Sequence, residues 1–88
     1  MDKEIVEGLS YIKSSKNRFK IIKSIDNSFK MPSEISNETE IRLNHVSALL
    51  SDLKNNDMVV CLNEDKSKGR IYCLTDYGKE IIKILNEK

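Results

Sequence analysis

Two short segments hold most of the side chains that could bind a ligand. The first, RLNHVSALLSDLKNNDM at positions 42–58, carries a guanidinium, two amides near its end, an imidazole and several hydroxyls among regularly spaced apolar residues. Such groups can hydrogen-bond to base edges or to phosphates. The second, DKSKGR at positions 65–70, places three cations around a glycine, and cations attract phosphates. Both segments therefore favour binding over bond-breaking chemistry.

Catalytic and metal-binding patterns are missing from the sequence. It contains no G-x-G-x-x-G or Walker loop, no paired catalytic carboxylates and no Ser/His/Asp set. His45 is the only histidine; it could contact a base or respond to pH, but it has no Cys or carboxylate at metal-ligand spacing. We therefore expect no metal, no cofactor and no small-molecule substrate, and the protein is not expected to be an enzyme.

Length and composition indicate one small helix-rich domain spanning 1–88. The chain has 88 residues, of which 39% are hydrophobic and 33% charged, which argues against disorder. Its longest apolar runs, such as 58–62, are far shorter than the roughly 20 residues of a membrane helix, so we expect a soluble cytoplasmic protein with no membrane partner. The net charge is only +1, which does not point to nucleic acid; however, an acidic back can accompany a basic front.

The first third of the chain shows two helical patterns. Apolar residues at helical spacing predict a short helix over 5–12, and Ser14 and Ser15 can interrupt the chain and cap a second helix over about 16–25. Polar residues 26–28 end that helix, and 29–31 could form a very short strand. The apolar positions are Ile5, Val6, Leu9 and Ile12 in the first helix, and Phe19, Ile21, Ile22 and Ile25 in the second.

The middle of the chain predicts two helices joined by a tight connection. Pro32 suits the first turn of a brief helix over about 33–38, which contributes Ile35 to the core. Residues 39–41 connect it to the clearest helix, at about 42–55. That helix has a single apolar stripe with offsets of three, four and seven, formed by Val46, Leu49, Leu50 and Leu53.

A β-hairpin and a last helix follow. Segments 58–63 and 70–75 are β-branched, aromatic and apolar, and a polar loop containing Gly69 separates them. Thr75 looks like the cap of a helix that runs to about Asn86. Gly78, one turn into that helix, indicates close packing against the 42–55 helix or the hairpin.

The two cysteines lie on opposite arms of the hairpin. If the hairpin is symmetric about Ser67, Cys61 faces Cys73 within disulfide range, and the Val60–Leu74 and Leu62–Tyr72 pairs face the core. Cys61 and Cys73 are then a candidate redox pair. The alternative is that both stay reduced and act as small apolar residues, as cytosolic cysteines usually do.

The order helix, helix, short strand, helix, helix, hairpin, helix predicts an α+β, mostly helical fold: a winged helix-turn-helix with a two-stranded wing. Five motifs in register over residues 19–85 resemble the ArsR/MarR-type winged-helix regulators of archaea and bacteria. They are Ser33-Glu34-Ile35, Val46-Ser47 with Leu50 and Leu53, Met58-Val59, Lys66 to Arg70, and Leu74-Thr75 with Gly78. Two positions depart from the pattern: Glu40 stands where glycine is usual, and Thr39 where an apolar residue is common.

The resemblance implies a sequence-specific transcriptional regulator that binds double-stranded DNA. The recognition helix, about 42–55, would enter the major groove, and the wing, 65–70, would contact the backbone or minor groove. Asn44 could pair with an adenine edge, Arg42 could reach guanine or phosphate, and the serines would contact phosphate. The candidate DNA-binding residues are Arg42, Asn44, His45, Ser47, Ala48, Ser51, Lys66, Lys68 and Arg70.

Two further expectations concern partners. A single recognition helix reads few base pairs, so we expect a homodimer that binds two half-sites. The terminal helices are its predicted surface, through Ile5, Val6, Leu9, Ile82 and Leu85, which exceed what a small core needs. The alternative function is a winged-helix module for protein–protein interaction within a larger assembly, and the near-neutral net charge favours that alternative.

Overall fold

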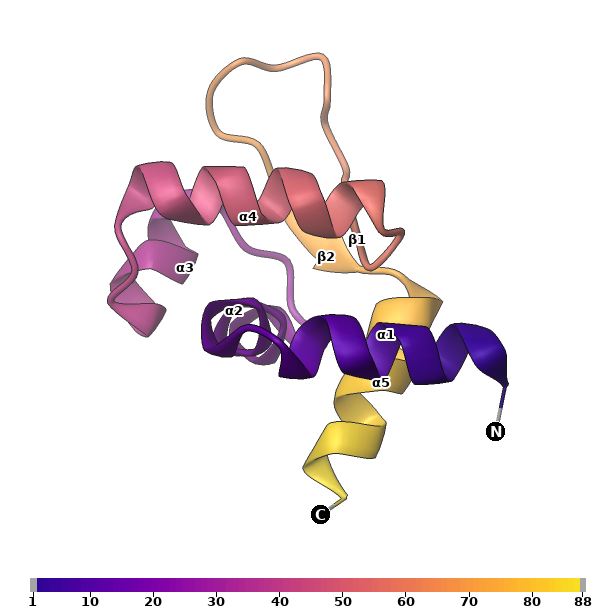
Figure 1. The fold of residues 1–88 in the computed structure, drawn as a ribbon. Coiled ribbons are helices and arrows are strands. Elements are labelled where there is room, and N and C mark those ends of the chain that lie inside the picture. The colour runs from indigo at the N-terminus through magenta and orange to yellow at the C-terminus, as the bar shows by residue number, and fades with distance from the viewer. Residues whose placement is uncertain (1, 88) are drawn as a thin grey trace.

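Five helices and one antiparallel hairpin form the fold in a computed structural model that describes residues 2–87 (Figure 1). In chain order they are α1 (Lys3–Lys13), α2 (Lys16–Ile25), α3 (Pro32–Thr39), α4 (Leu43–Asn55), β1 (Val59–Cys61), β2 (Tyr72–Leu74) and α5 (Asp76–Asn86). The predicted order of helices and hairpin is confirmed. Within residues 2–87, no helix combines the length and apolar character needed to cross a membrane.

Side-chain caps set the starts of α2 and α5 as the sequence predicts. The hydroxyl of Ser15 accepts a hydrogen bond from the Arg18 amide, and that of Thr75 accepts one from the Gly78 amide at 3.0 Å. Each cap satisfies one of the free amides at a helix start and stabilises the fold by about 1 kcal/mol. Pro32 occupies the first turn of α3, where its missing amide costs nothing.

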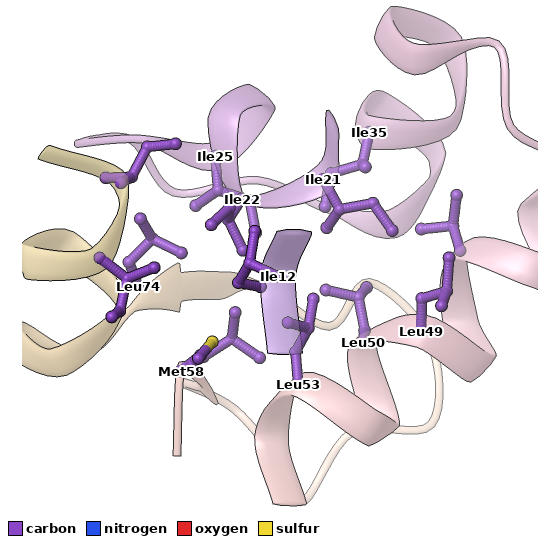
Figure 2. Close-up of a cluster of buried hydrophobic side chains, with 14 of the residues drawn as sticks. Ile12, Ile21, Ile22, Ile25, Ile35, Leu49, Leu50, Leu53, Met58 and Leu74 are labelled. Carbon is purple, nitrogen blue, oxygen red and sulfur yellow. The ribbon is translucent and has the colours of Figure 1, made fainter. Parts of the chain in front are cut away.

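An isoleucine-rich core joins the helices and fixes the rotation of α4. Figure 2 shows side chains from α1, α2, α3, α4 and the hairpin converging on one cluster. The whole predicted stripe of α4 is buried there, which confirms the expectation from the sequence: Val46, Leu49, Leu50 and Leu53. Because this stripe faces inward, the opposite face of α4 is presented to solvent.

More apolar residues of the terminal helices are buried inside the monomer than the sequence predicts. Ile5 and Ile82, which were assigned to a dimer surface, are buried in the core, so that part of the prediction is wrong. They are buried because α1 and α5 pack together, with the Tyr77 hydroxyl donating to the Glu4 carbonyl at 2.7 Å. Of the five assigned residues, only Val6 is classed as exposed, at 47%; Leu9 and Leu85 are half-buried.

The hairpin is shorter than predicted, and its register differs by one residue. Val59 pairs with Leu74, Val60 with Cys73, and Cys61 with Tyr72. A slip of one residue moves every side chain of a strand to the other face. Val59 and Cys61 therefore face the core, whereas Val60 is 39% and Leu62 55% exposed. The prediction that Val60 and Leu62 face the core is wrong.

The register is set at the base of the hairpin. Helix α4 ends in a Schellman motif: Asp57 has φ 61°, its amide donates to the Lys54 carbonyl, and the Met58 amide donates to the Leu53 carbonyl. The Met58 carbonyl then accepts from the Thr75 amide at 3.0 Å. This bond places Met58 opposite Thr75 and fixes every pair above it. The departure from a symmetric hairpin is accommodated in the loop. There the Ile71 amide donates its hydrogen bond to the side-chain oxygen of Asn63 rather than to a backbone carbonyl.

The segment predicted as a very short strand makes a single bridge. Lys30 exchanges two backbone hydrogen bonds with Tyr72, of 2.9 and 2.8 Å, on the edge of β2 that β1 leaves free. Its ammonium group also forms an ion pair with Glu38 of α3. The bridge and the ion pair together tie the approach to α3 to the hairpin.

The space around Gly78 shows how tightly α5 packs on the hairpin. A Cβ at Gly78 would lie 2.3 Å from the Met58 carbonyl oxygen, which confirms the predicted close packing and assigns it to the hairpin side. We expect Gly78→Ala to lower the free energy of unfolding by about 2–3 kcal/mol, because overpacking outweighs the roughly 1 kcal/mol gain in helix propensity. Urea denaturation measures this.

Gly8→Ala is the matched control for that measurement. A Cβ at Gly8 would meet the Tyr77 hydroxyl at 2.4 Å and the end of Ile81 at 2.8 Å, both parts of side chains that can move. We expect a smaller loss of stability than for Gly78→Ala. A Gly78→Ala variant as stable as the parent chain would contradict the packing derived for Met58 and α5.

Candidate nucleic-acid interface

The outward face of α4 is polar along its first turns. The helix begins one residue later than predicted, with Arg42 as its N-cap. Asn44 and Ala48 lie opposite the buried stripe, as the 3.6-residue period requires. All six sequence-predicted residues of this segment are exposed: Arg42, Asn44, His45, Ser47, Ala48 and Ser51. The side chains of this face can therefore hydrogen-bond to a ligand while the buried stripe stays in the core.

The turn that orients α4 against α3 is closed by a residue in an unfavourable conformation. Glu40 adopts a left-handed backbone with φ 62° and ψ 19°, the geometry that glycine adopts without strain. Its amide donates to the Ser36 carbonyl, and the Ser36 hydroxyl donates to the Ile41 carbonyl at 2.6 Å. Buried Ile41 anchors the end of the turn. The departure from glycine at this position is thus accommodated by the usual turn rather than by a different one.

Hydrogen bonds within the hairpin loop hold its conformation. Gly69 has φ +69°, a conformation that other residues rarely adopt. The Arg70 guanidinium donates to the Lys66 carbonyl at 2.6 Å and to the Glu64 carbonyl at 3.3 Å. Arg70 thereby closes the loop, while Lys66 and Lys68 are exposed and form no ion pair with any residue from 2 to 87.

A groove of about 460 Å³ connects α4 with this loop. It brings together four of the sequence-predicted residues, Ser47, Ser51, Lys68 and Arg70, from two separate segments. Arg42, Asn44, His45, Ala48 and Lys66 are exposed outside it. The other lining residues are Met31, Pro32, Ser33, Leu43, Lys54, Ser67, Gly69 and Tyr72.

Two of the groove residues on α4 were missed by sequence reasoning. Leu43 and Lys54 continue the row of Ser47 and Ser51 at spacings of four, four and three, so all four share one flank of the helix. This row lies directly beside the buried stripe, and its helical spacing was a signal that could have identified it.

One ion pair links the groove to the base of the loop. The ammonium of Lys54 on α4 contacts the carboxylate of Glu64. The hydrogen bond between them lowers the pKa of Glu64 and raises the pKa of Lys54, so both remain charged near neutral pH. Glu64 therefore offsets part of the positive charge that Lys54 brings to the groove.

Negative charge gathers in a different part of the molecule. A second hollow lies where α1 begins, α4 ends and α5 begins, and six carboxylates line it: Asp2, Glu4, Glu7, Asp57, Asp76 and Glu80. Burial of the Tyr77 hydroxyl, and then the nearby Glu4 and Glu7, raise the pKa of Tyr77. The net charge of +1 is thus the sum of separated acidic and basic regions.

The same arrangement of elements occurs in solved structures. TubR from Bacillus thuringiensis serovar israelensis pBtoxis, bound to 24 bp of tubC, matches with a TM-score of 0.81 at 15% identity, over 94% of this chain and 92% of TubR. The MarR family transcriptional regulator SPO1453 from Silicibacter pomeroyi DSS-3 matches with a TM-score of 0.72 at 11% identity. That match covers 97% of this chain and 63% of SPO1453. The fold is a winged helix-turn-helix.

In the terms of this fold, α3 and α4 form the helix-turn-helix, α4 occupies the position of the recognition helix, and the hairpin loop of residues 62–71 occupies that of the wing. At these identities the likeness shows the fold alone. No protein-family model matches the sequence, and no curated protein sequence matches it significantly.

The two cysteines do not face each other across the wing. Cys61 is on the core face of the ribbon, whereas Cys73 pairs with Val60 on the other face. The predicted opposition of Cys61 and Cys73 is wrong because the register is one residue away from symmetry about Ser67, which places the two sulfurs on opposite sides. Both cysteines are free, and within residues 2–87 no three His, Cys, Asp or Glu side chains are placed so that they could hold one metal ion.

This placement predicts two thiols of unequal reactivity. We expect iodoacetamide to label half-exposed Cys73 readily, and buried Cys61 only on unfolding. Mass spectrometry of the labelled native protein measures the two rates. Mild oxidation with diamide should leave the monomer without an internal disulfide, and a Cys61–Cys73 disulfide in the folded protein would contradict the register.

Proposed function

We propose that this protein is a transcriptional regulator that binds double-stranded DNA in a sequence-specific manner. The observation that carries the proposal is the groove in which the polar row of the recognition helix faces the cationic wing. Recognition of duplex DNA needs a helix for base edges and separate cations for the backbone, and this surface offers both side by side.

In the proposed complex, α4 lies in the major groove, which at about 12 Å is wide enough for one helix. The outward Asn44 pairs with an adenine edge through its amide, and Arg42 contacts guanine or phosphate. His45 and Ala48 complete the surface that approaches the bases. The buried stripe of α4 keeps these side chains facing away from the core.

One DNA strand would then pass between α4 and the wing. The hydroxyls of Ser47 and Ser51 and the ammonium of Lys68 line its path. Hydroxyl and ammonium groups commonly contact phosphates, and these contacts set register without reading sequence. Lys66, exposed next to this path, would reach the backbone or the adjacent minor groove.

The structural neighbours support the proposal. TubR, which aligns over almost the whole chain, is bound to DNA in its structure, and SPO1453 is described as a transcriptional regulator. Neither is described as an enzyme, in keeping with our proposal of a non-enzymatic regulator that acts on cytoplasmic DNA.

We also propose a homodimer that presents two recognition helices. The apolar surface left for it is smaller than the sequence predicted. Leu85 also lines a hollow where α1, α2 and α5 meet, together with Ile12 and Phe19. Val6 on α1 adds exposed apolar area. A dimer would bring two half-sites about one helical turn apart into contact with the protein.

Salt dependence tests the DNA contacts of the wing. We expect wild-type protein to bind random-sequence duplex at low salt and to lose affinity steeply as salt rises. The Lys66→Ala/Lys68→Ala double variant should bind all sequences more weakly, with a log–log salt slope lower by about 2, because each lysine accounts for about one phosphate. Fluorescence anisotropy at several salt concentrations measures both quantities.

Two further variants sharpen this test. Lys79→Ala/Lys83→Ala removes two exposed lysines from α5, outside the groove, and should leave the slope unchanged. Glu64→Gln releases Lys54 from its ion pair and should tighten binding. Absence of duplex binding by wild-type protein at low salt, or an unchanged slope in the wing variant, would overturn the proposal and favour a protein-interaction module.

Sedimentation tests the homodimer separately from DNA binding. We expect a dimer at tens of micromolar protein and a shift toward monomer in Val6→Lys, because a charge at an apolar interface is costly to bury. Leu62→Lys, on the wing, is the control and should remain dimeric. A wild-type monomer at this concentration would contradict the dimer but not the groove.

A further inference from the structure

The recognition helix exposes one large apolar side chain. Leu43, its first residue, is 50% exposed and lies outside the core cluster. Met31, which precedes α3, is 37% exposed. Both line the groove together with Pro32.

Leu43 therefore differs from an isolated exposed leucine. Single apolar residues on a surface are common and need no explanation. Here, Met31, Pro32 and Leu43 line a groove whose other lining is rich in hydroxyl and cationic side chains, among them Ser47, Ser51 and Lys68. Leu43 also lies at the start of α4, the part of a recognition helix that contacts base edges.

The chemistry of the DNA major groove limits which groups Leu43 could recognise there. Donors and acceptors of the bases are read by polar side chains, whereas the C5-methyl of thymine is the base feature that apolar side chains recognise. Phosphates would gain nothing from Leu43. Deoxyribose carbons offer apolar contact too, but they are the same at every position and cannot give sequence preference.

We propose that Leu43, in a groove that Met31 also lines, recognises the methyl group of a thymine, so that an A·T pair at this position forms part of the sequence specificity. The inference rests on the proposed function, since it needs α4 in the major groove. It adds a specificity-determining residue to the polar candidates on α4.

The test uses deoxyuridine, which keeps the base pairing and the O4 acceptor of thymine and lacks only the methyl group. A duplex is first selected from random sequences with wild-type protein, and each thymine is then replaced singly by deoxyuridine. We expect one or two replacements to weaken wild-type binding by about three- to fivefold, the value of one methyl group withdrawn from water.

Variants assign the effect to Leu43. Leu43→Ala should bind the thymine and deoxyuridine duplexes with equal affinity at that position. Leu43→Met, which keeps an apolar side chain of similar reach, should restore the preference. Leu62→Ala removes an equally exposed leucine on the wing, outside the groove, and should keep the wild-type preference. Circular dichroism confirms that each variant is folded.

Failure of this inference is distinguishable from failure of the proposed function. Wild-type protein that binds no duplex at low salt overturns both. Tight duplex binding that no deoxyuridine replacement weakens, a selected sequence without thymine, or an unchanged preference in Leu43→Ala overturns the role of Leu43 and leaves DNA binding standing.

Discussion

The backbone of Met58 is the junction on which the arrangement of recognition helix and wing depends. Its amide closes the Schellman motif at the end of α4, and its carbonyl accepts from Thr75 and lies against Gly78. The Thr75 hydroxyl adds a bond to the Asp57 carbonyl at 2.6 Å. The end of α4, both strands and the start of α5 therefore meet at one residue, whose side chain is itself buried. Any rotation of the hairpin relative to α4 would break several of these contacts together, so the hairpin is held in one orientation relative to α4.

The start of α4 is held in place by the turn that precedes it. Glu40 stores a left-handed conformation, which costs about 1 kcal/mol for a residue with a Cβ. The buried Ile35 and Ile41 on either side offset this cost. The bridge of Lys30 to Tyr72 then connects the approach to α3 with the hairpin. As a result, the candidate contact residues other than Arg70, which closes the loop, contribute little to the framework that holds them. Substituting these residues changes the surface with little effect on folding, which is why binding variants at these positions are informative.

Periodicity predicted the helices well because each apolar stripe has only one way to face the core. The stripe of α4 and the caps Ser15 and Thr75 follow from local sequence alone. The strand register did not follow, because it depends on the Met58–Thr75 bond at the base, whereas the sequence offered only the length of the loop. The burial of Ile5 and Ile82 could not be predicted from the sequence either. A count of apolar residues does not say which of them the packing of α1 on α5 will bury. For the site, helical spacing identified the polar face of α4, but its junction with the wing needed the fold.

The separation of charge explains why the composition alone was a poor guide to a nucleic-acid surface. The acidic hollow at the ends of α1, α4 and α5 offsets the lysines of the wing in the total but lies outside the groove. Electrostatic attraction of a polyanion depends on the potential near the contact, which salt screens over about 10 Å. A nearly neutral chain can therefore grip a phosphate backbone locally. Glu64 opposes this attraction through its ion pair with Lys54, which lines the groove, and phosphates that approach Lys54 would compete with that carboxylate for the same ammonium. Binding at this edge is thus an exchange of partners, so Lys54 should add less to affinity than the unpaired Lys66 and Lys68.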